Sequence, residues 1–252
     1  MAPLTSDNSA LYQFAGVDGC ASGWLLASFS GGRTQLHLAA SVQEAFALMA
    51  PRGLTAIDMP IGLATAGRRG CDRLARQALG RVRASSVFAA PRRPMLACAS
   101  YEEANALGKA QGPEAGGGLS KQAWNILPKI KELDEAMSPA RQARRFEAHP
   151  EVAFLRLAGV TGDAGAPWRD ALPSKKTTEG RAARLTLLRA AGAPIGESEI
   201  EGFRRENRGC AADDILDACA LALTAEARAA GEAWRFSDEL RDERGLIMEI
   251  WG

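Results

Sequence analysis

The first forty residues alternate between short apolar runs and turn-forming residues. The apolar runs cover residues 12–17, 24–29 and 34–40. Small and glycine residues separate the first two runs, and Gly31-Gly32 separates the second from the third, which is a hairpin signal. The pattern predicts three sequential strands that form an antiparallel meander.

A helix and a fourth strand follow the meander. Ser41 and Glu44 form the S-x-x-E pattern of a capping box and predict a helix that runs to about Ala50. Pro51 ends that helix, and residues 54–57 are apolar again. A strand that is reached through a helix is expected to pair parallel within the same sheet.

The remaining pattern predicts helices, two further strands and two long loops. Helices are expected at 72–79, 121–137 with a kink or break at Pro128, 179–191 and 212–230, strands at 145–148 and 246–251, and loops at 108–119 and 159–173. We therefore expect a single α/β domain over residues 1–252 with a helical insertion around residues 66–140. Its sheet is mixed, with three antiparallel strands followed by parallel strands, and helices flank it.

Charge is spread unevenly along the chain. The formal net charge of the 252 residues is +1, so the overall basic character of many nucleic-acid-binding proteins is absent. Residues 68–93, however, contain eight arginines and a single acid, Asp72. This segment predicts a local basic face on a protein that is nearly neutral as a whole.

The cysteines and the apolar segments exclude several classes of protein. There are five cysteines and no C-x-x-C pair, which argues against a disulfide framework and against a zinc knuckle. The N-terminus lacks the pattern of a signal peptide, and no apolar stretch approaches the roughly 20 residues that span a bilayer. We expect a cytoplasmic protein with reduced thiols and no membrane association.

Two aspartates lie at the ends of predicted strands. Asp18 ends the first strand, and Asp58 ends the fourth. Each can simply begin a turn. In an open α/β sheet, however, ligand sites form at the ends of neighbouring strands, and an unpaired buried charge is unfavourable there. Two acids at adjacent positions therefore favour a functional site.

The predicted helix at 212–230 begins with three more acids. Asp214 and Asp217 are three residues apart and share a helix face, and Asp213 and Asp217 are four apart. The helix dipole explains acids in the first turn, but it explains Asp217 less well because that residue lies deeper among apolar neighbours. Near the fifth strand, the sequence Glu-x-His-Pro-Glu makes His149 and Glu151 further candidates.

These acids suit divalent metal ions. Mg²⁺ and Mn²⁺ prefer oxygen ligands and use a few carboxylates while they keep several waters. Two such ions can activate a water and stabilise a leaving oxygen in phosphodiester cleavage. No G-x-S-x-G motif and no convincing Cys–His pair offers a competing nucleophile.

The order of the elements resembles the ribonuclease-H-like fold, whose members carry acids on the first strand, the fourth strand and the last helix. Asp18, Asp58 and Asp214 or Asp217 match those positions. More closely, the chain resembles the domain of unknown function family 429, whose members are described as predicted nucleases of this fold. The matching segments are 16–20 with 23–24, 57–62, 69–72, 85–88, 120–122, 147–151, 174–176 and 213–218.

Hydroxyl and cationic side chains suit phosphate oxygens. We expect Ser85, Ser86, Lys121, Lys175 and Lys176 to bind substrate, although each patch can also be ordinary solvated surface. With the neighbouring arginines, they predict a groove for the phosphate backbone of a nucleic acid.

The leading hypothesis is a metal-dependent nuclease that cleaves DNA or RNA. Asp18, Asp58 and Asp214 or Asp217 are expected to bind Mg²⁺ or Mn²⁺, with Glu151 as a further ligand or proton acceptor. A second hypothesis is a nucleotide-binding phosphotransferase of the related actin-like class, although the second strand–Asp–Gly hairpin of that class is absent from the sequence. A third is a non-catalytic binding protein that keeps the fold.

Overall fold

The computed structural model describes residues 11–112, 117–159 and 172–252. Its first element is an antiparallel meander of β1 (Tyr12–Cys20), β2 (Gly23–Ser30) and β3 (Arg33–Ala39). Gly31 and Gly32 both have positive φ values, 58° and 71°, and close the two-residue turn between β2 and β3. The pairing confirms the predicted meander. Glycine adopts the positive φ values of this turn without steric strain.

The helix after the meander is shorter than the sequence predicts. In α1 (Val42–Ala47), the Ser41 side chain accepts a hydrogen bond from the Glu44 N–H group, as the capping box requires. The expected end at Ala50 is wrong, because β4 (Met49–Ile57) begins at Met49. An irregularity in the β1–β4 pairing, between the Tyr12–Met49 and Phe14–Leu54 pairs, accommodates the proline and glycine within this strand.

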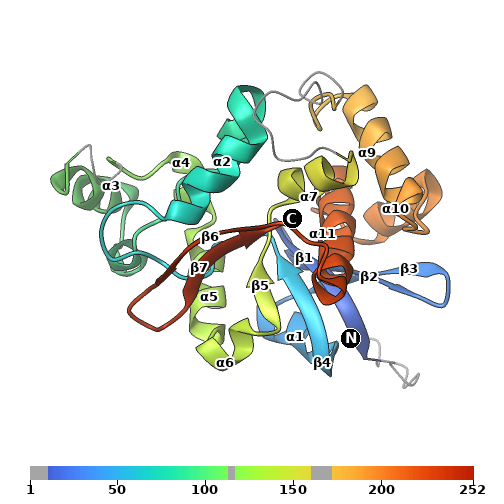
Figure 1. The fold of residues 1–252 in the computed structure, drawn as a ribbon, viewed down its shortest axis with the longest axis horizontal. Coiled ribbons are helices and arrows are strands. Elements are labelled where there is room, and N and C mark those ends of the chain that lie inside the picture. Colours follow the sequence, from blue (N-terminus) through green and yellow to red (C-terminus); the bar gives the residue numbers. More distant parts are fainter. Residues whose placement is uncertain (1–10, 113–116, 160–171) are drawn as a thin grey trace.

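One five-stranded sheet organises the fold (Figure 1). Its strand order is β3-β2-β1-β4-β5, where β5 is Arg145–Glu147. β4 pairs parallel with both β1 and β5, so three antiparallel strands are followed by parallel ones. The sheet therefore has the ribonuclease-H-like arrangement that the sequence predicts.

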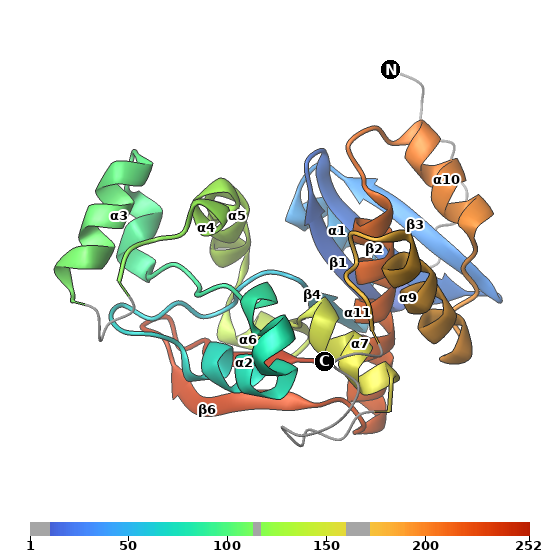
Figure 2. The ribbon, with the colours of Figure 1, turned by 90° about the horizontal axis from the view of Figure 1, so that it is seen from above.

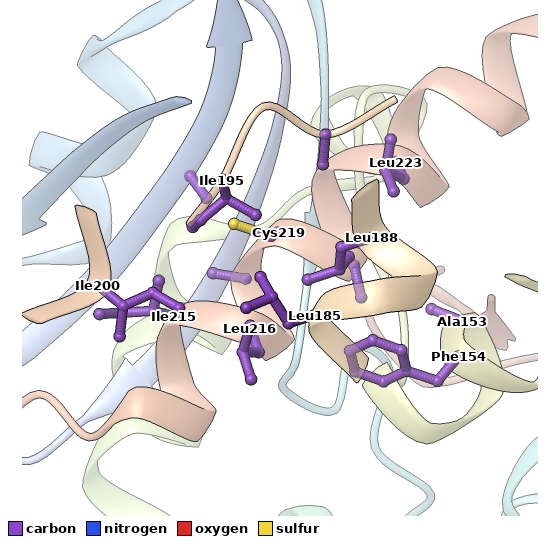
Figure 3. Packing of buried hydrophobic residues seen from close by; sticks show 14 of the residues in the cluster. Ala153, Phe154, Leu185, Leu188, Ile195, Ile200, Ile215, Leu216, Cys219 and Leu223 are labelled. Carbon is purple, nitrogen blue, oxygen red and sulfur yellow. The ribbon is translucent and has the colours of Figure 1, made fainter. Parts of the chain in front are cut away.

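Helices cover both faces of this sheet. The long helix α11 (Ala212–Ala230) crosses β1, β2 and β4 on one face. Beside it lie α7 (Pro150–Leu157), α9 (Thr178–Ala190) and α10 (Glu197–Glu206), and Figure 3 shows the apolar side chains that join them. On the opposite face, α1 and α5 (Leu127–Ala136) cover the apolar side chains of β1, β2 and β4.

The segment between β4 and β5 is mostly helical. It contains α2 (Gly70–Arg83), the 3₁₀ turns η1 (Ala84–Ser86) and η2 (Arg93–Ala97), α3 (Tyr101–Ala110), α4 (Lys121–Asn125), α5 and α6 (Pro139–Gln142). The predicted helix at 121–137 is broken at Ile126, two residues before Pro128, which lies in the first turn of α5. In Figure 2, α3 and α4 lie on one side of the molecule, and α9 and α10 lie on the other.

Several local predictions need correction. The loop expected at 108–119 begins inside α3, and residues 113–116 lie outside the described residues, as do residues 160–171 of the second expected loop. The last strand, β7 (Ile247–Trp251), is confirmed, but it pairs with β6 (Arg235–Arg241), an unexpected strand, in a separate two-stranded sheet. The sequence analysis also misses α3, α6, α7 and α10, which are short or lack a strong apolar stripe.

No helix in the described part of the chain combines the length and the apolar composition that a bilayer crossing needs.

Gly16 lets α11 lie directly against the sheet. A Cβ atom at this position would overlap the backbone carbonyl of Ala218 and the backbone amide of Ala222. Because both obstacles are backbone atoms, no side-chain rotation can relieve the overlap. Side chains alternate along a strand, so Gly16 and Asp18 face the same side, toward α11.

We predict that Gly16→Ala lowers the free energy of unfolding by about 2 kcal/mol or more, because the helix must shift to admit a methyl group. Urea unfolding measures the change. Gly202→Ala is the matched control: Gly202 lies in α10 with only the tip of the Arg205 side chain near a Cβ atom, so this change is expected to stabilise by about 0.5–1 kcal/mol. Equal effects of the two substitutions would contradict the close-approach argument.

Candidate functional site

Asp18 and Asp58 lie side by side at the ends of two parallel strands. Val17 pairs with Ile57 in the β1–β4 register, and the Asp58 N–H group donates to the Val17 carbonyl at 2.9 Å. Asp18 is buried, with 8% of its surface exposed, whereas Asp58 is partly exposed. The strand register therefore brings together the two acids that the sequence places at strand ends.

Asp217 joins them from α11. It directly precedes Ala218, the residue that packs on Gly16, and only 2% of its surface is exposed. Its Oδ2 atom accepts a hydrogen bond from Lys175 Nζ at 2.6 Å. Its Oδ1 atom is buried without a hydrogen-bond partner among the described residues. An unpartnered buried carboxylate oxygen is uncommon and points to a group that the protein alone does not supply.

Asp213 and Asp214 lie at the more exposed start of the same helix. Asp214 accepts a hydrogen bond from the Ala211 N–H group at 2.8 Å and so caps α11. Asp213 Oδ2 lies 3.9 Å from Lys175 Nζ. The helix-start explanation therefore accounts for one oxygen of Asp214, whereas Asp217 occupies the buried position next to Asp18 and Asp58.

Burial and the repulsion between neighbouring carboxylates raise the pKa values of these acids. Burial raises the pKa of Asp18 well above its ordinary value, and repulsion by Asp58, Asp217 and Asp214 adds to this effect. Burial likewise raises the pKa of Asp58 to about 7 and the pKa of Asp217 to about 6, although Lys175 opposes both shifts. The acids are thus near enough to influence one another strongly.

Lys175 is the cation of this cluster. Burial lowers its pKa, but Asp217, Asp58 and Asp18 outweigh that effect and raise it above the ordinary value. The ammonium group is therefore charged at neutral pH. It partly neutralises acids that otherwise repel one another.

The acids fit a hard divalent cation in donor chemistry but are not gathered around one point. Among residues 11–112, 117–159 and 172–252, no three histidine, cysteine or acidic side chains are close enough to hold a metal ion as they stand. Lys175 instead bonds to one Asp217 oxygen, and the other oxygen has no partner. Asp18, Asp58 and Asp217 are the residues whose oxygens would serve as ligands for such an ion.

Glu151 lies nearby but is held by arginines. Its Oε1 atom is 2.6 Å from Arg184 Nη2, and its Oε2 atom is 3.5 Å from Arg83 Nη1. The same two arginines donate to the backbone carbonyls of Pro173 and Leu172. Glu151 therefore anchors the segment that carries Lys175, and these contacts favour a positioning role over that of a metal ligand.

His149 caps α7. Its Nδ1 atom accepts from the Glu151 N–H group at 3.2 Å, so the proton resides on Nε2, which faces the Ser86 carbonyl at 3.3 Å. Burial lowers the pKa of His149. The neutral imidazole thus fixes the start of α7 against the η1 turn.

Glu147, the last residue of β5, belongs to a cluster of ion pairs with a structural role. It accepts from Arg69 Nη1 and from the Ile61 N–H group, each at 2.7 Å, and Arg69 also binds Asp72. All three charged side chains are buried. They tie the segment after β4 to β5 and do not face the acids of the site.

A pocket of about 650 Å³ opens beside the acids and contains most of the predicted substrate-binding residues. Its lining includes Asp58, Glu151, His149, Arg83, Gln122, Ser85, Ser86, Lys175 and Lys176. Lys121 does not line it, because its ammonium group lies 3.4 Å from the centre of the Tyr101 ring.

The sequence analysis misses Arg184, although this residue carries a usable signal: it is a charged residue on the apolar face of a helix, beside Leu185 and Leu188. Arg83, which belongs to the arginine-rich segment 68–93, also lines the pocket.

We predict that Asp58→Asn stabilises the metal-free protein at pH 8 but not near pH 4. The raised pKa means that the folded state keeps a proton that the unfolded state releases, so this group destabilises the fold as the pH rises from about 4 to about 7. Asparagine does not ionise, so above pH 7 the free energy of unfolding of the variant is expected to exceed that of the wild type by about 1 kcal/mol or more. Urea unfolding in a chelator at both pH values measures it. Glu135→Gln, at an exposed position of α5, is the control, and a gain of equal size at both pH values would refute the argument.

Among the comparisons with known proteins, only the comparison with protein families finds a match. No curated protein and no solved structure matches the chain. The family model described as "Protein of unknown function (DUF429)" matches residues 16–241, which include Asp18, Asp58, Lys175 and Asp217. Because this match covers most of the chain, the chain belongs to the DUF429 family.

Proposed function

We propose that this protein is a metal-dependent hydrolase that cleaves phosphodiester bonds in nucleic acid. One observation carries the proposal: Asp18, Asp58 and Asp217 are brought together at one end of the sheet, and a buried oxygen of Asp217 has no partner among the described residues. Gathering like charges in a poorly solvated place is unfavourable for folding. Such an arrangement is typical of a site that binds cations.

The chain supplies groups for each part of the reaction. Asp18, Asp58 and Asp217 are the proposed holders of Mg²⁺ or Mn²⁺, and Asp214 is near enough to raise the pKa of Asp18 and Asp58. When bound, such an ion lowers the pKa of a water molecule and stabilises charge on phosphate oxygens. Lys175, once released from Asp217, can hold a phosphate group in the adjoining pocket together with Lys176.

Basic residues extend away from the acids. A second pocket of about 310 Å³ shares Ser85, Phe88 and Gln122 with the pocket beside the acids. It also contains Arg68 and Arg76, which come from the arginine-rich segment. Two adjoining basic pockets favour a substrate with several phosphates in a row over a single nucleotide.

The direct test is hydrolysis of fluorescent single-stranded and double-stranded DNA and RNA in Mn²⁺. We predict that Asp18→Asn lowers the rate at least 100-fold, because it removes one charged oxygen from the proposed metal site. Glu135→Gln is again the control. An Asp18→Asn variant as active as the wild type, with either metal, would exclude the mechanism.

Calorimetry separates a binding protein from a nuclease. A wild-type chain that binds Mn²⁺ through Asp18 but cleaves no nucleic acid would support the metal site and reject the nuclease proposal.

We predict that Lys175→Met tightens Mn²⁺ binding about tenfold while it slows hydrolysis. The substitution removes a positive charge that lies 2.6 Å from Asp217 and competes with the ion. It also removes a phosphate-binding group. Titration calorimetry with Mn²⁺ measures the first effect, and steady-state kinetics measure the second. Lys176→Met is the matched control for Mn²⁺ binding, since the ion pairs with Asp213 and Asp217 are made by Lys175. Weaker Mn²⁺ binding would show instead that Lys175 holds the acids in place.

A further inference from the structure

A second group of basic side chains lies at the other end of the parallel strands. It consists of Arg141 in α6, Arg144 in the turn that follows, and Arg145 at the start of β5. They line a cavity of about 420 Å³ together with Gln43, Phe46, Ala47, Pro51 and Ala140. Pro51 and Asp58 are seven residues apart on and just after β4, so the cavity lies roughly 20 Å from the acids at about 3.3 Å per residue.

These three arginines differ in their partners from several arginines that are buried in the core; Arg141 is exposed, and Arg144 and Arg145 are half-buried. Arg69, Arg93 and Arg184 each form an ion pair with at least one carboxylate. Within the described residues, Arg141, Arg144 and Arg145 form none. Three neighbouring guanidinium groups therefore share one cavity without a countercharge, in a protein whose net charge is only +1.

The protein holds these side chains in place through neutral contacts. Arg141 Nη1 donates to the Ala136 carbonyl at 2.5 Å, and Arg144 Nη1 donates to the Arg52 carbonyl at 2.8 Å. Arg145 donates to the Gly53 carbonyl and lies over the Phe46 ring, 5.3 Å from its centre. Each guanidinium has five N–H donors, so these contacts leave donors for a ligand. Held in this way, the arginines lose little conformational freedom when an anion binds.

We propose that this arginine pocket, defined by Arg141, Arg144, Arg145 and Phe46, binds a small phosphorylated anion. Guanidinium groups pair with phosphate oxygens through two parallel hydrogen bonds, and three of them match a ligand with more than one phosphate charge. The cavity has the size of a small-molecule site. The proposal is independent of the proposed hydrolase activity, because none of the acids of that site lines this cavity.

The test is titration calorimetry of the full chain with inorganic pyrophosphate, in a chelator and without divalent metal. We expect the wild type to bind pyrophosphate and Arg141→Gln/Arg144→Gln to bind it at least tenfold more weakly. Arg145→Lys keeps the charge but loses the planar fork, so its affinity is expected to fall less. Thermal unfolding of each variant checks that it is folded.

Two controls and three contrary outcomes complete the experiment. Arg33→Gln, at an exposed hairpin position, and Lys131→Gln, at an exposed position of α5, are expected to bind as the wild type does. No binding to the wild type, or an equal loss in Arg33→Gln, overturns the proposal. If an oligonucleotide binds through Arg141 and Arg144 but pyrophosphate does not, the pocket serves a nucleic acid and the small-ligand proposal is wrong.

Discussion

Gly16 allows the backbone of α11 to lie directly on β1, and this contact sets the positions of the acids in the site. Ala218 packs on Gly16, so Asp217 must lie beside the next side chain on the same face of the strand, which is Asp18. The parallel register of β1 and β4 then adds Asp58. Three acids that are far apart in the sequence thus lie near enough to influence one another, because one residue of the first strand lacks a side chain.

The fold then tolerates a charge distribution that works against its own stability. Burial and mutual repulsion raise the pKa values of Asp18, Asp58 and Asp217, so the charged form of each carboxyl group destabilises the fold. Lys175 offsets part of this repulsion from a segment that Glu151 and two arginines hold in place. Strain of this electrostatic kind is a common feature of sites that bind a cation.

The two ends of the parallel strands carry side chains of opposite charge. Asp18, Asp58 and Asp217 lie near one end together with Lys175, and the cavity at the other end is lined by arginines with no acid among the described residues. Since unlike charges are kept apart along the sheet, neither group neutralises the other. Each end thus retains an unbalanced local charge, which is the condition for binding an ion of opposite sign.

The sequence by itself determined the meander, the helix at 212–230 and the acids at strand ends, because local periodicity and turn residues encode these features. It also indicated Asp214 and Asp217 as candidates, of which the helix dipole explains Asp217 less well. Only the tertiary structure showed that Asp217 is buried against the sheet, since that depends on where α11 crosses Gly16. The partners of Glu151 and Lys175 were equally out of reach, because Arg83, Arg184 and Asp217 approach them from other elements. Long-range contacts of this kind leave little trace in spacing or composition.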